Sequence, residues 1–184
     1  MARILRPITL LLAAFTMLAV SAGPTDAAPA EAARPARQLG YTQVTVAPDT
    51  LAALTSLGVT PGVVEPGRLA SADPLSVQFP ITGYRLTNLR ITHAGGVTLS
   101  AGATTVTLTD FNIDLARLRV SGDVAGIGRV DLFKIRFSDR FDLGAVKLVL
   151  TAEAAGALNQ AFGTDALTED FLFGYATPKP FARF

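Results

Sequence analysis

The chain has 184 residues, no cysteine, no tryptophan, a single histidine and a formal net charge of +1. Without cysteine it forms neither a disulfide nor a cysteine-ligated zinc site. A chain this close to neutral, with no basic run, lacks the charge pattern of a nucleic-acid-binding protein. Its length is sufficient for one domain that buries its own hydrophobic core.

The N-terminus has the pattern of a secretory signal peptide. Two arginines precede an uncharged apolar run, residues 8–20, which is too short to cross a bilayer comfortably. Small residues offer cleavage sites after residue 22 or after residue 30. We predict a signal peptide over residues 1–22, with 30 as the alternative end, and a secreted or cell-envelope protein without a transmembrane segment after cleavage. An uncleaved membrane anchor is the alternative.

The rest of the chain divides into a leader and one folded domain. Residues 23–38 are rich in alanine and proline and show no hydrophobic period, which predicts a disordered leader. Residues 39–184 are predicted to form a single domain of short alternating segments separated by glycine, proline and aspartate. This pattern indicates a mainly β fold, either an antiparallel β-sandwich or a distorted barrel.

Alternating apolar residues predict the inward faces of the first strands. These residues are Val44 and Val46; Val77, Phe79 and Ile81; Leu89, Ile91 and His93; and Val97 and Leu99. Pro80 lies inside the second group, and because proline has no amide donor it indicates a sheet edge or a bulge there.

In two later predicted strands, the apolar residues switch from even-numbered to odd-numbered positions. The groups are Val106 and Leu108, followed by Phe111, Ile113 and Leu115; and Val130 and Leu132, followed by Phe133, Ile135 and Phe137. One extra residue in a strand restores the inward face after such a change. We therefore predict a β-bulge near Thr109 and Asp110 and a similar switch before Phe133. The last two strands, residues 145–150 and 171–177, are expected to alternate without interruption.

Two segments, residues 48–57 and 152–162, interrupt the strand pattern and predict short α-helices. Pro48 suits the first helical position. Thr151 suits the N-cap of the second helix, and Gly163 its C-terminal stop. Both helices lie between strands, and we expect them to close opposite ends of the sandwich. Their similar spacing indicates either a weak internal duplication or convergent capping.

The chain lacks the residue sets that common enzymes and metal sites require. A nucleophile–base pair would have to use His93, and neither a Gly-x-Ser-x-Gly motif nor a glycine-rich phosphate loop is present. The carboxylates of Asp139 and Asp142 form either a calcium site or, as is usual, solvated turn residues. We predict no catalytic residue, no enzymatic activity and no bound metal.

The segment ITHAGGVTLSAGATTVTLTDFNIDL, residues 91–115, and the later segment LTAEAA, residues 150–155, carry a resemblance to a known family. The order of elements from Phe79 onward resembles the haem-transport-associated (HtaA-like) domain of secreted actinobacterial proteins, of which the chain would be a degenerate or sister group. The resemblance covers about the last two thirds of the chain and implies the family architecture, with haem as a candidate ligand. His93 corresponds to the supporting histidine of the family, whereas the Phe-x-x-Tyr motif with the axial tyrosine has no counterpart near Tyr41.

The candidate ligand-binding residues are His93, Tyr84 and Tyr175. His93 shares its parity with residues expected to point inward, so it either lines a pocket or is buried with a hydrogen-bond partner at a strand end. The predicted function is a secreted or envelope-associated, non-enzymatic binding module for haem or another hydrophobic ligand. The alternative is a structural or protein-interaction domain of the cell envelope without a small-molecule ligand.

Overall fold

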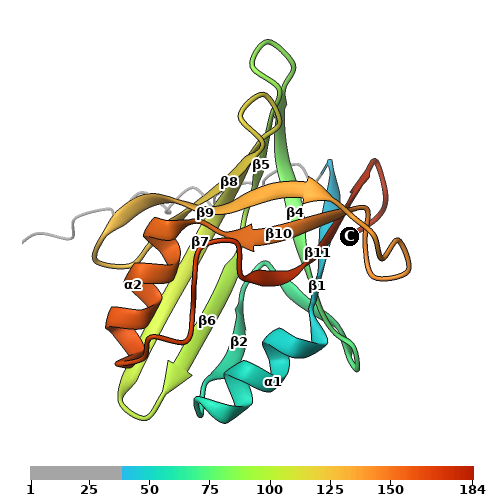
Figure 1. The fold of residues 1–184 in the computed structure, drawn as a ribbon. Helices are drawn as coiled ribbons and strands as arrows, with labels where there is room; N and C mark the ends of the chain where they lie inside the picture. The colour runs from blue at the N-terminus through green and yellow to red at the C-terminus, as the bar shows by residue number, and fades with distance from the viewer. Residues whose placement is uncertain (1–38) are drawn as a thin grey trace, which may run out of the picture. The chain divides into compact units, whose positions relative to one another are not determined.

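The computed structural model describes residues 39–184, so the predicted signal peptide and leader lie outside the described residues (Figure 1). The strands are β1 Gly40–Val46, β2 Thr60–Val64, β3 Arg68–Ala72, β4 Leu75–Arg85, β5 Arg90–His93, β6 Gly96–Ala101, β7 Thr104–Asp114, β8 Arg119–Val124, β9 Gly128–Phe137, β10 Val146–Leu150 and β11 Leu172–Pro180. The helices are α1 Pro48–Ser56 and α2 Ala152–Phe162. Within residues 39–184, neither helix has the length and apolarity that a membrane crossing requires.

Eight strands close into an antiparallel barrel in the order β4-β1-β11-β10-β9-β8-β7-β5. The ring closes because β8 pairs with both β9 and β7, while the short β5 joins β7 to β4. Strands β6 and β2 extend the sheet from the other half of β7, and β3 pairs with the first half of β4. The sequence predicts a mainly β fold, either a β-sandwich or a distorted barrel, and the closed ring corresponds to the distorted barrel.

The parity change in β7 is a β-bulge, as predicted. The pairing of β7 with β8 shifts between Thr109 and Asn112, and Asp110 has a left-handed φ of 52°. Leu108 before the bulge and Phe111 after it are both buried inside the barrel. The extra residue therefore keeps both side chains on the inner face.

Strand β9 contains the second predicted switch. Val120 of β8 pairs with Phe133, and Ser121 pairs with Asp131, which leaves Leu132 as the extra residue. Consecutive residues Leu132 and Phe133 are buried together as a result.

Pro80 was expected to mark either a sheet edge or a bulge, and it lies beside a register shift of the bulge type. Strand β4 pairs with β3 up to Gln78 and with β5 from Ile81 onward, and the β5 pairing shifts between Ile81 and Gly83. Pro80 thus occupies the point at which β4 changes its partner on this side.

Three residues predicted to point inward are exposed instead. Leu89, Leu115 and Phe137 are 51%, 44% and 93% exposed. Leu89 precedes β5, Leu115 follows β7, and Phe137 is the last residue of β9. The alternating pattern extends into these positions in the sequence, but the strands end at them, and their side chains leave the interior.

The expectation that the last strand alternates without interruption is wrong. Leu148 of β10 pairs with Gly174, whereas Val149 pairs with Leu172. Phe173 is therefore an extra residue in β11, and it packs against the core.

Both helices form where the capping residues predict. Pro48 stands at the start of α1, the hydroxyl oxygen of Thr151 accepts a hydrogen bond from the Ala154 amide at 3.1 Å, and Gly163 ends α2 with a φ of 63°. These local signals need no tertiary information, which explains why the sequence alone is sufficient to place the helices.

The expectation that the helices close opposite ends is wrong, because both pack at the same end (Figure 1). Leu54 of α1 joins one apolar cluster with Leu99, against which Leu158 and Phe162 of α2 pack. The reason is topological. Strands β1 and β10, which precede the helices, are both antiparallel to β11 and therefore run in the same direction.

Candidate functional site: an apolar cavity with one histidine

The barrel encloses a cavity of about 360 Å³. Aliphatic and aromatic side chains make up nearly all of its wall, among them Val44, Val77, Phe79, Val97, Leu108 and Leu148. Protein interiors are close-packed and contain few voids larger than a water molecule. Small-molecule sites, by contrast, are mostly apolar hollows of about 300–1,000 Å³ with a few polar groups, and this cavity has the size and lining of such a site.

The cavity reaches the surface between β2 and β3. Pro61 and Val63 of β2 and Leu69 of β3 line it, and Val63 and Leu69 are 36% and 54% exposed. Strand β2 pairs with β6 and β3 pairs with β4, so no ladder of hydrogen bonds joins β2 to β3 in the described sheet. This seam between the two strands is therefore lined by apolar side chains.

His93 is the one titratable residue among the described residues that line the cavity. It ends β5, is 5% exposed, and its Nδ1 lies 3.2 Å from the carbonyl oxygen of Phe111. Its Nε2 lies 2.7 Å from the hydroxyl oxygen of Thr42. Because a carbonyl oxygen only accepts, Nδ1 carries the proton, and Nε2 accepts a hydrogen bond from the Thr42 hydroxyl. Both ring nitrogens are therefore satisfied within the protein.

Burial keeps the His93 imidazole neutral. Desolvation lowers its pKa from 6.5 to about 4, and the hydrogen bond with the Phe111 carbonyl offsets only part of that shift. At neutral pH the wall of the cavity consequently carries no charge on any described side chain.

Gly95 and Gly96 follow closely after His93 and allow their own segment, strand β7 and the turn between β2 and β3 to approach one another. A Cβ atom on Gly96 would collide with the carbonyl oxygen of Leu108, and one on Gly95, whose φ is +82°, would collide with the backbone of Gly67. The Asp110 amide then donates to the Gly95 carbonyl at 3.0 Å. This close approach holds the end of β5 against the bulge of β7 and places His93 next to the Phe111 carbonyl.

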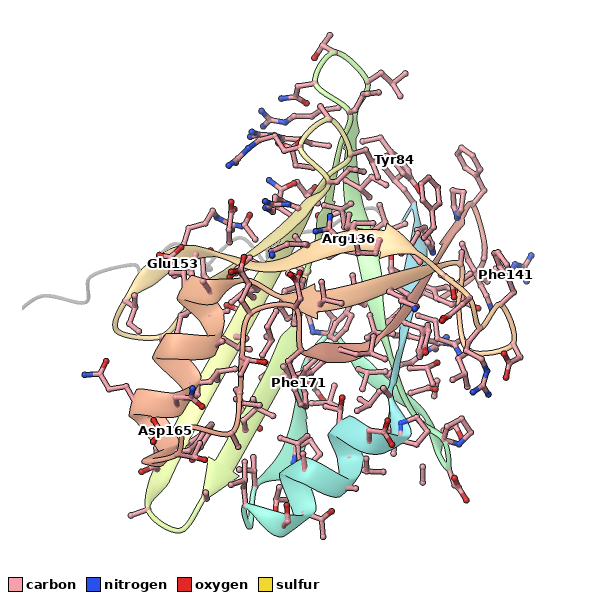
Figure 2. All side chains as sticks on the ribbon, in the orientation of Figure 1. Tyr84, Arg136, Phe141, Glu153, Asp165 and Phe171 are labelled. Carbon is pink, nitrogen blue, oxygen red and sulfur yellow. The ribbon has the colours of Figure 1, made fainter. Side chains whose placement is uncertain are left out.

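Tyr84, a predicted ligand-binding residue, lies outside the cavity wall. Its hydroxyl donates to the Leu39 carbonyl at 3.2 Å, and its ring centre lies 6.2 Å from that of Phe181 (Figure 2). Partial burial raises its pKa. These contacts connect the two ends of the folded region rather than a ligand site.

Tyr175 is buried, at 5% exposure, but does not line the cavity either. The extra residue Phe173 reverses the parity of β11, so that Phe173 and Ala176 line the cavity instead. Tyr175 packs next to Gly144, in the segment between β9 and β10. The structure thus places one of the three predicted residues, His93, at the site.

Thr42 is the residue of this site that the sequence interpretation missed. It is 3% exposed and supplies the hydroxyl that is hydrogen-bonded to His93. The sequence did indicate that Thr42 points inward, because it lies on the same face of an alternating strand as Val44 and Val46.

The residues around the cavity do not fit haem. Proteins ligate haem iron through histidine, cysteine, methionine or tyrosine, and among the described lining residues only His93 is of these types. Its Nε2 already accepts a hydrogen bond from the Thr42 hydroxyl and so is not free to bind iron. No described arginine or lysine lines the cavity to pair with the haem propionates.

The acidic loop before β10 does not form a metal site in the described structure. Asp139 accepts a hydrogen bond from Lys147 at 2.7 Å, and Asp142 accepts one from Arg140 at 2.9 Å. Across residues 39–184, no group of three or more histidine, cysteine or acidic side chains is arranged to hold a metal ion.

Comparison with known proteins relates the chain to one solved fold. No family model and no curated protein matches it. The crystal structure of the C-terminal domain of HtaA from Corynebacterium glutamicum is similar, with a TM-score of 0.50 and 11% sequence identity over 74% of this chain and 93% of that chain. At this identity the similarity shows a distant relationship in fold, and the resemblance seen in the sequence is confirmed at that level.

Proposed function

We propose that this domain binds an uncharged, largely hydrocarbon molecule inside its barrel, as a non-enzymatic carrier or sensor that the cell exports or holds in its envelope. The observation that supports the proposal is the cavity of about 360 Å³, whose apolar wall includes the single polar pair His93 and Thr42. The signal-peptide pattern at the N-terminus supports the export part of the proposal.

The size of the cavity argues for an occupant. The cavity is lined by partly exposed residues of β2 and β3, so water reaches its apolar wall. A molecule of matching size removes that wall from water, which is favourable by about 25 cal/mol for each Å² of apolar surface, and adds dispersion contacts.

The chemistry of the wall argues for an uncharged ligand. His93 is neutral, and the described lining residues include no cation or carboxylate to pair with a charged group. An unpaired charge inside an apolar cavity is strongly unfavourable. The Thr42 hydroxyl donates to His93 but keeps lone pairs of its own, so the site has room for one ligand hydroxyl that donates to Thr42.

A second hollow favours an elongated ligand. About 260 Å³ of space lies between α2 and strands β6 to β9, and it shares part of its lining with the main cavity. The shared residues are Leu99, Leu108, Phe133 and Phe173. A ligand longer than the main cavity would pass between these four side chains to reach the second space.

A fluorescent apolar probe tests this function, and a matched pair of variants locates the site. Val44 lines the cavity, whereas its neighbour Gln43 lies on the opposite face of β1. We expect the unaltered protein to bind N-phenyl-1-naphthylamine saturably, Val44→Phe to weaken binding by about tenfold, and Gln43→Phe to leave it unchanged within about twofold. Equal binding by all three proteins, or none by the unaltered one, would contradict the proposal and favour a structural or protein-interaction role.

A haem titration completes the test. Because the His93 and Thr42 hydrogen bonds occupy the imidazole, we expect no Soret shift that depends on His93. A shift that disappears in His93→Ala while the fold is retained would instead identify haem as the ligand.

A further inference from the structure

Two neighbouring β-hairpins carry the same sequence pattern at their tips. The β4–β5 turn reads Leu-Thr-Asn-Leu-Arg, residues 86–90, and the β7–β8 turn reads Leu-Ala-Arg-Leu-Arg, residues 115–119. The second leucine of each turn has a left-handed backbone, with φ of 52° at Leu89 and 51° at Leu118. Leucine is uncommon in this conformation, which glycine or asparagine adopts at lower cost. Leucine in both equivalent positions therefore indicates a role beyond forming the turn.

Four leucines at these two tips are exposed, and they are here named the tip patch: Leu86, Leu89, Leu115 and Leu118, with exposures of 84%, 51%, 44% and 47%. The Leu115 amide donates to the Leu89 carbonyl at 3.0 Å, which joins the two turns. Figure 1 shows both hairpins projecting from the end of the barrel away from α1. Exposed apolar groups clustered in this way mark sites of contact with a protein or a membrane.

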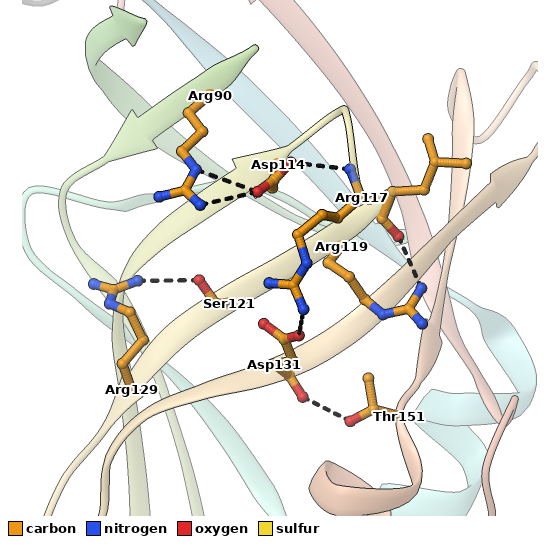
Figure 3. A network of polar contacts seen from close by, with 9 residues as sticks. Arg90, Asp114, Arg117, Arg119, Ser121, Arg129, Asp131 and Thr151 are labelled. Atoms are coloured by element: carbon orange, nitrogen blue, oxygen red, sulfur yellow. Dashed lines mark hydrogen bonds and ion pairs between the residues drawn. The ribbon is translucent and has the colours of Figure 1, made fainter. Parts of the chain in front are cut away.

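Arginines surround the tip patch. Residues 85–90 and 114–119 contain four arginines and one aspartate, a net charge of +3, and Arg117 forms an ion pair with Asp131 of β9 at 3.2 Å. Asp114 accepts hydrogen bonds from the Arg90 guanidinium at 3.2 Å and the Arg117 amide at 3.0 Å, which fixes the hairpins to each other (Figure 3). Arg85 and Arg119 form no ion pair within residues 39–184, and Arg119 Nη1 donates to the Leu118 carbonyl at 3.3 Å.

We propose that the tip patch docks on an anionic phospholipid surface, with the leucines inserted at the level of the acyl chains and the arginines on the phosphate groups. Leucine insertion and attraction of basic residues to anionic lipid are the two terms that hold peripheral proteins on membranes. The composition of the patch favours lipid, because exposed leucines beside Arg85 and Arg119 match a surface of hydrocarbon beneath phosphate groups. This proposal rests on different residues from the cavity and stands or fails independently of it.

The absence of tryptophan from the chain permits a direct readout. Leu86→Trp places a single fluorescent reporter at a tip, and Phe141→Trp places one at an equally exposed site, 78% exposed, in the β9–β10 loop away from the tips (Figure 2). With phosphatidylcholine vesicles that contain phosphatidylglycerol, we expect a blue shift and quenching by brominated acyl chains for Leu86→Trp only. With phosphatidylcholine alone we expect neither reporter to respond.

Two double variants separate insertion from charge. We expect Leu86→Ser with Leu118→Ser, and separately Arg85→Gln with Arg119→Gln, each to weaken vesicle binding by about tenfold, and the arginine variant also to reduce its salt dependence. All proteins are compared with the same N-terminus, because residues 8–20 would themselves bind lipid. An unshifted Leu86→Trp spectrum on anionic vesicles would overturn the proposal. Full binding by the serine variant would overturn it as well, even if the glutamine variant loses binding.

Discussion

The cavity and the tip patch are both built from aliphatic side chains, but they treat polar groups in opposite ways. Inside the barrel the polar pair His93 and Thr42 is neutral and hydrogen-bonded to the protein itself. At the tips, leucines alternate with arginines, of which Arg85 and Arg119 form no ion pair within residues 39–184. The first arrangement suits a ligand that leaves water completely, and the second suits an interface between hydrocarbon and charged headgroups.

The same comparison predicts where stability resides. Interior side chains bury their surface within the folded chain, whereas the tip leucines are exposed to solvent. Substitutions should therefore be costly inside the barrel and nearly neutral at the tips.

The largest expected effect is at Phe111, which is 9% exposed and packs edge-on against Phe79 with ring centres 5.0 Å apart. We expect Phe111→Ala to lower the free energy of unfolding by about 3–5 kcal/mol in a urea titration.

Deleting Asp110 tests the bulge that aims Phe111 inward. We expect this deletion to be destabilising as well, because it returns the strand to strict alternation and disrupts its pairing with β8. Unchanged stability after the deletion, together with a large loss in Phe111→Ala, would show that the break at Asp110 is an ordinary turn.

The next effect is a dependence of stability on pH that arises from His93. Its pKa is about 4 in the folded protein and about 6.5 when unfolded, so the unfolded chain binds the extra proton first as pH falls. The stabilisation is complete above about pH 6.5 and is lost progressively down to about pH 4, by about 3 kcal/mol in total. Urea titrations across this range should show the loss in the unaltered chain and lack this component in His93→Gln. Parallel curves for the two proteins would refute a neutral, buried His93.

Thr42→Val should have a smaller effect. The substitution keeps the shape of the side chain but removes the hydroxyl that donates to His93 Nε2, leaving a buried acceptor unsatisfied. We expect a loss of about 1–3 kcal/mol in the free energy of unfolding. In the His93→Gln background the same substitution should cost less, and a double-mutant cycle with no coupling would argue against the hydrogen bond.

The smallest effect is expected at the tips. Leu86 is 84% exposed, so Leu86→Ser should change the free energy of unfolding by about 0.5 kcal/mol or less. A loss of several kcal/mol would mean that the tip leucines support the fold instead of serving a partner.

Local signals explain which features could be predicted from the sequence. The bulge at Asp110 and both helices depend on parity and capping residues that lie within a few positions of one another. The bulge at Phe173 has no such signal, because the following Gly174 has no side chain to mark a face.

The cavity could not be predicted, because it depends on how the barrel closes. Closure brings Thr42 against His93, 51 positions later in the chain, and leaves the interior partly unfilled. The inward prediction for the leucines at the tips was wrong for a different reason. Leucine in a turn continues the apolar alternation of the strand, so Leu89 and Leu115 were expected inside.

The most direct test of the cavity is a methyl NMR titration of the valine- and leucine-labelled protein with N-phenyl-1-naphthylamine. We expect saturable shifts of the methyl groups of Val44, Val77, Val97 and Leu148, which line the cavity, and no shift at Leu86 or Leu118. Shifts confined to the tip leucines, or an unperturbed interior at saturating probe, would contradict the claim that the barrel holds an apolar ligand.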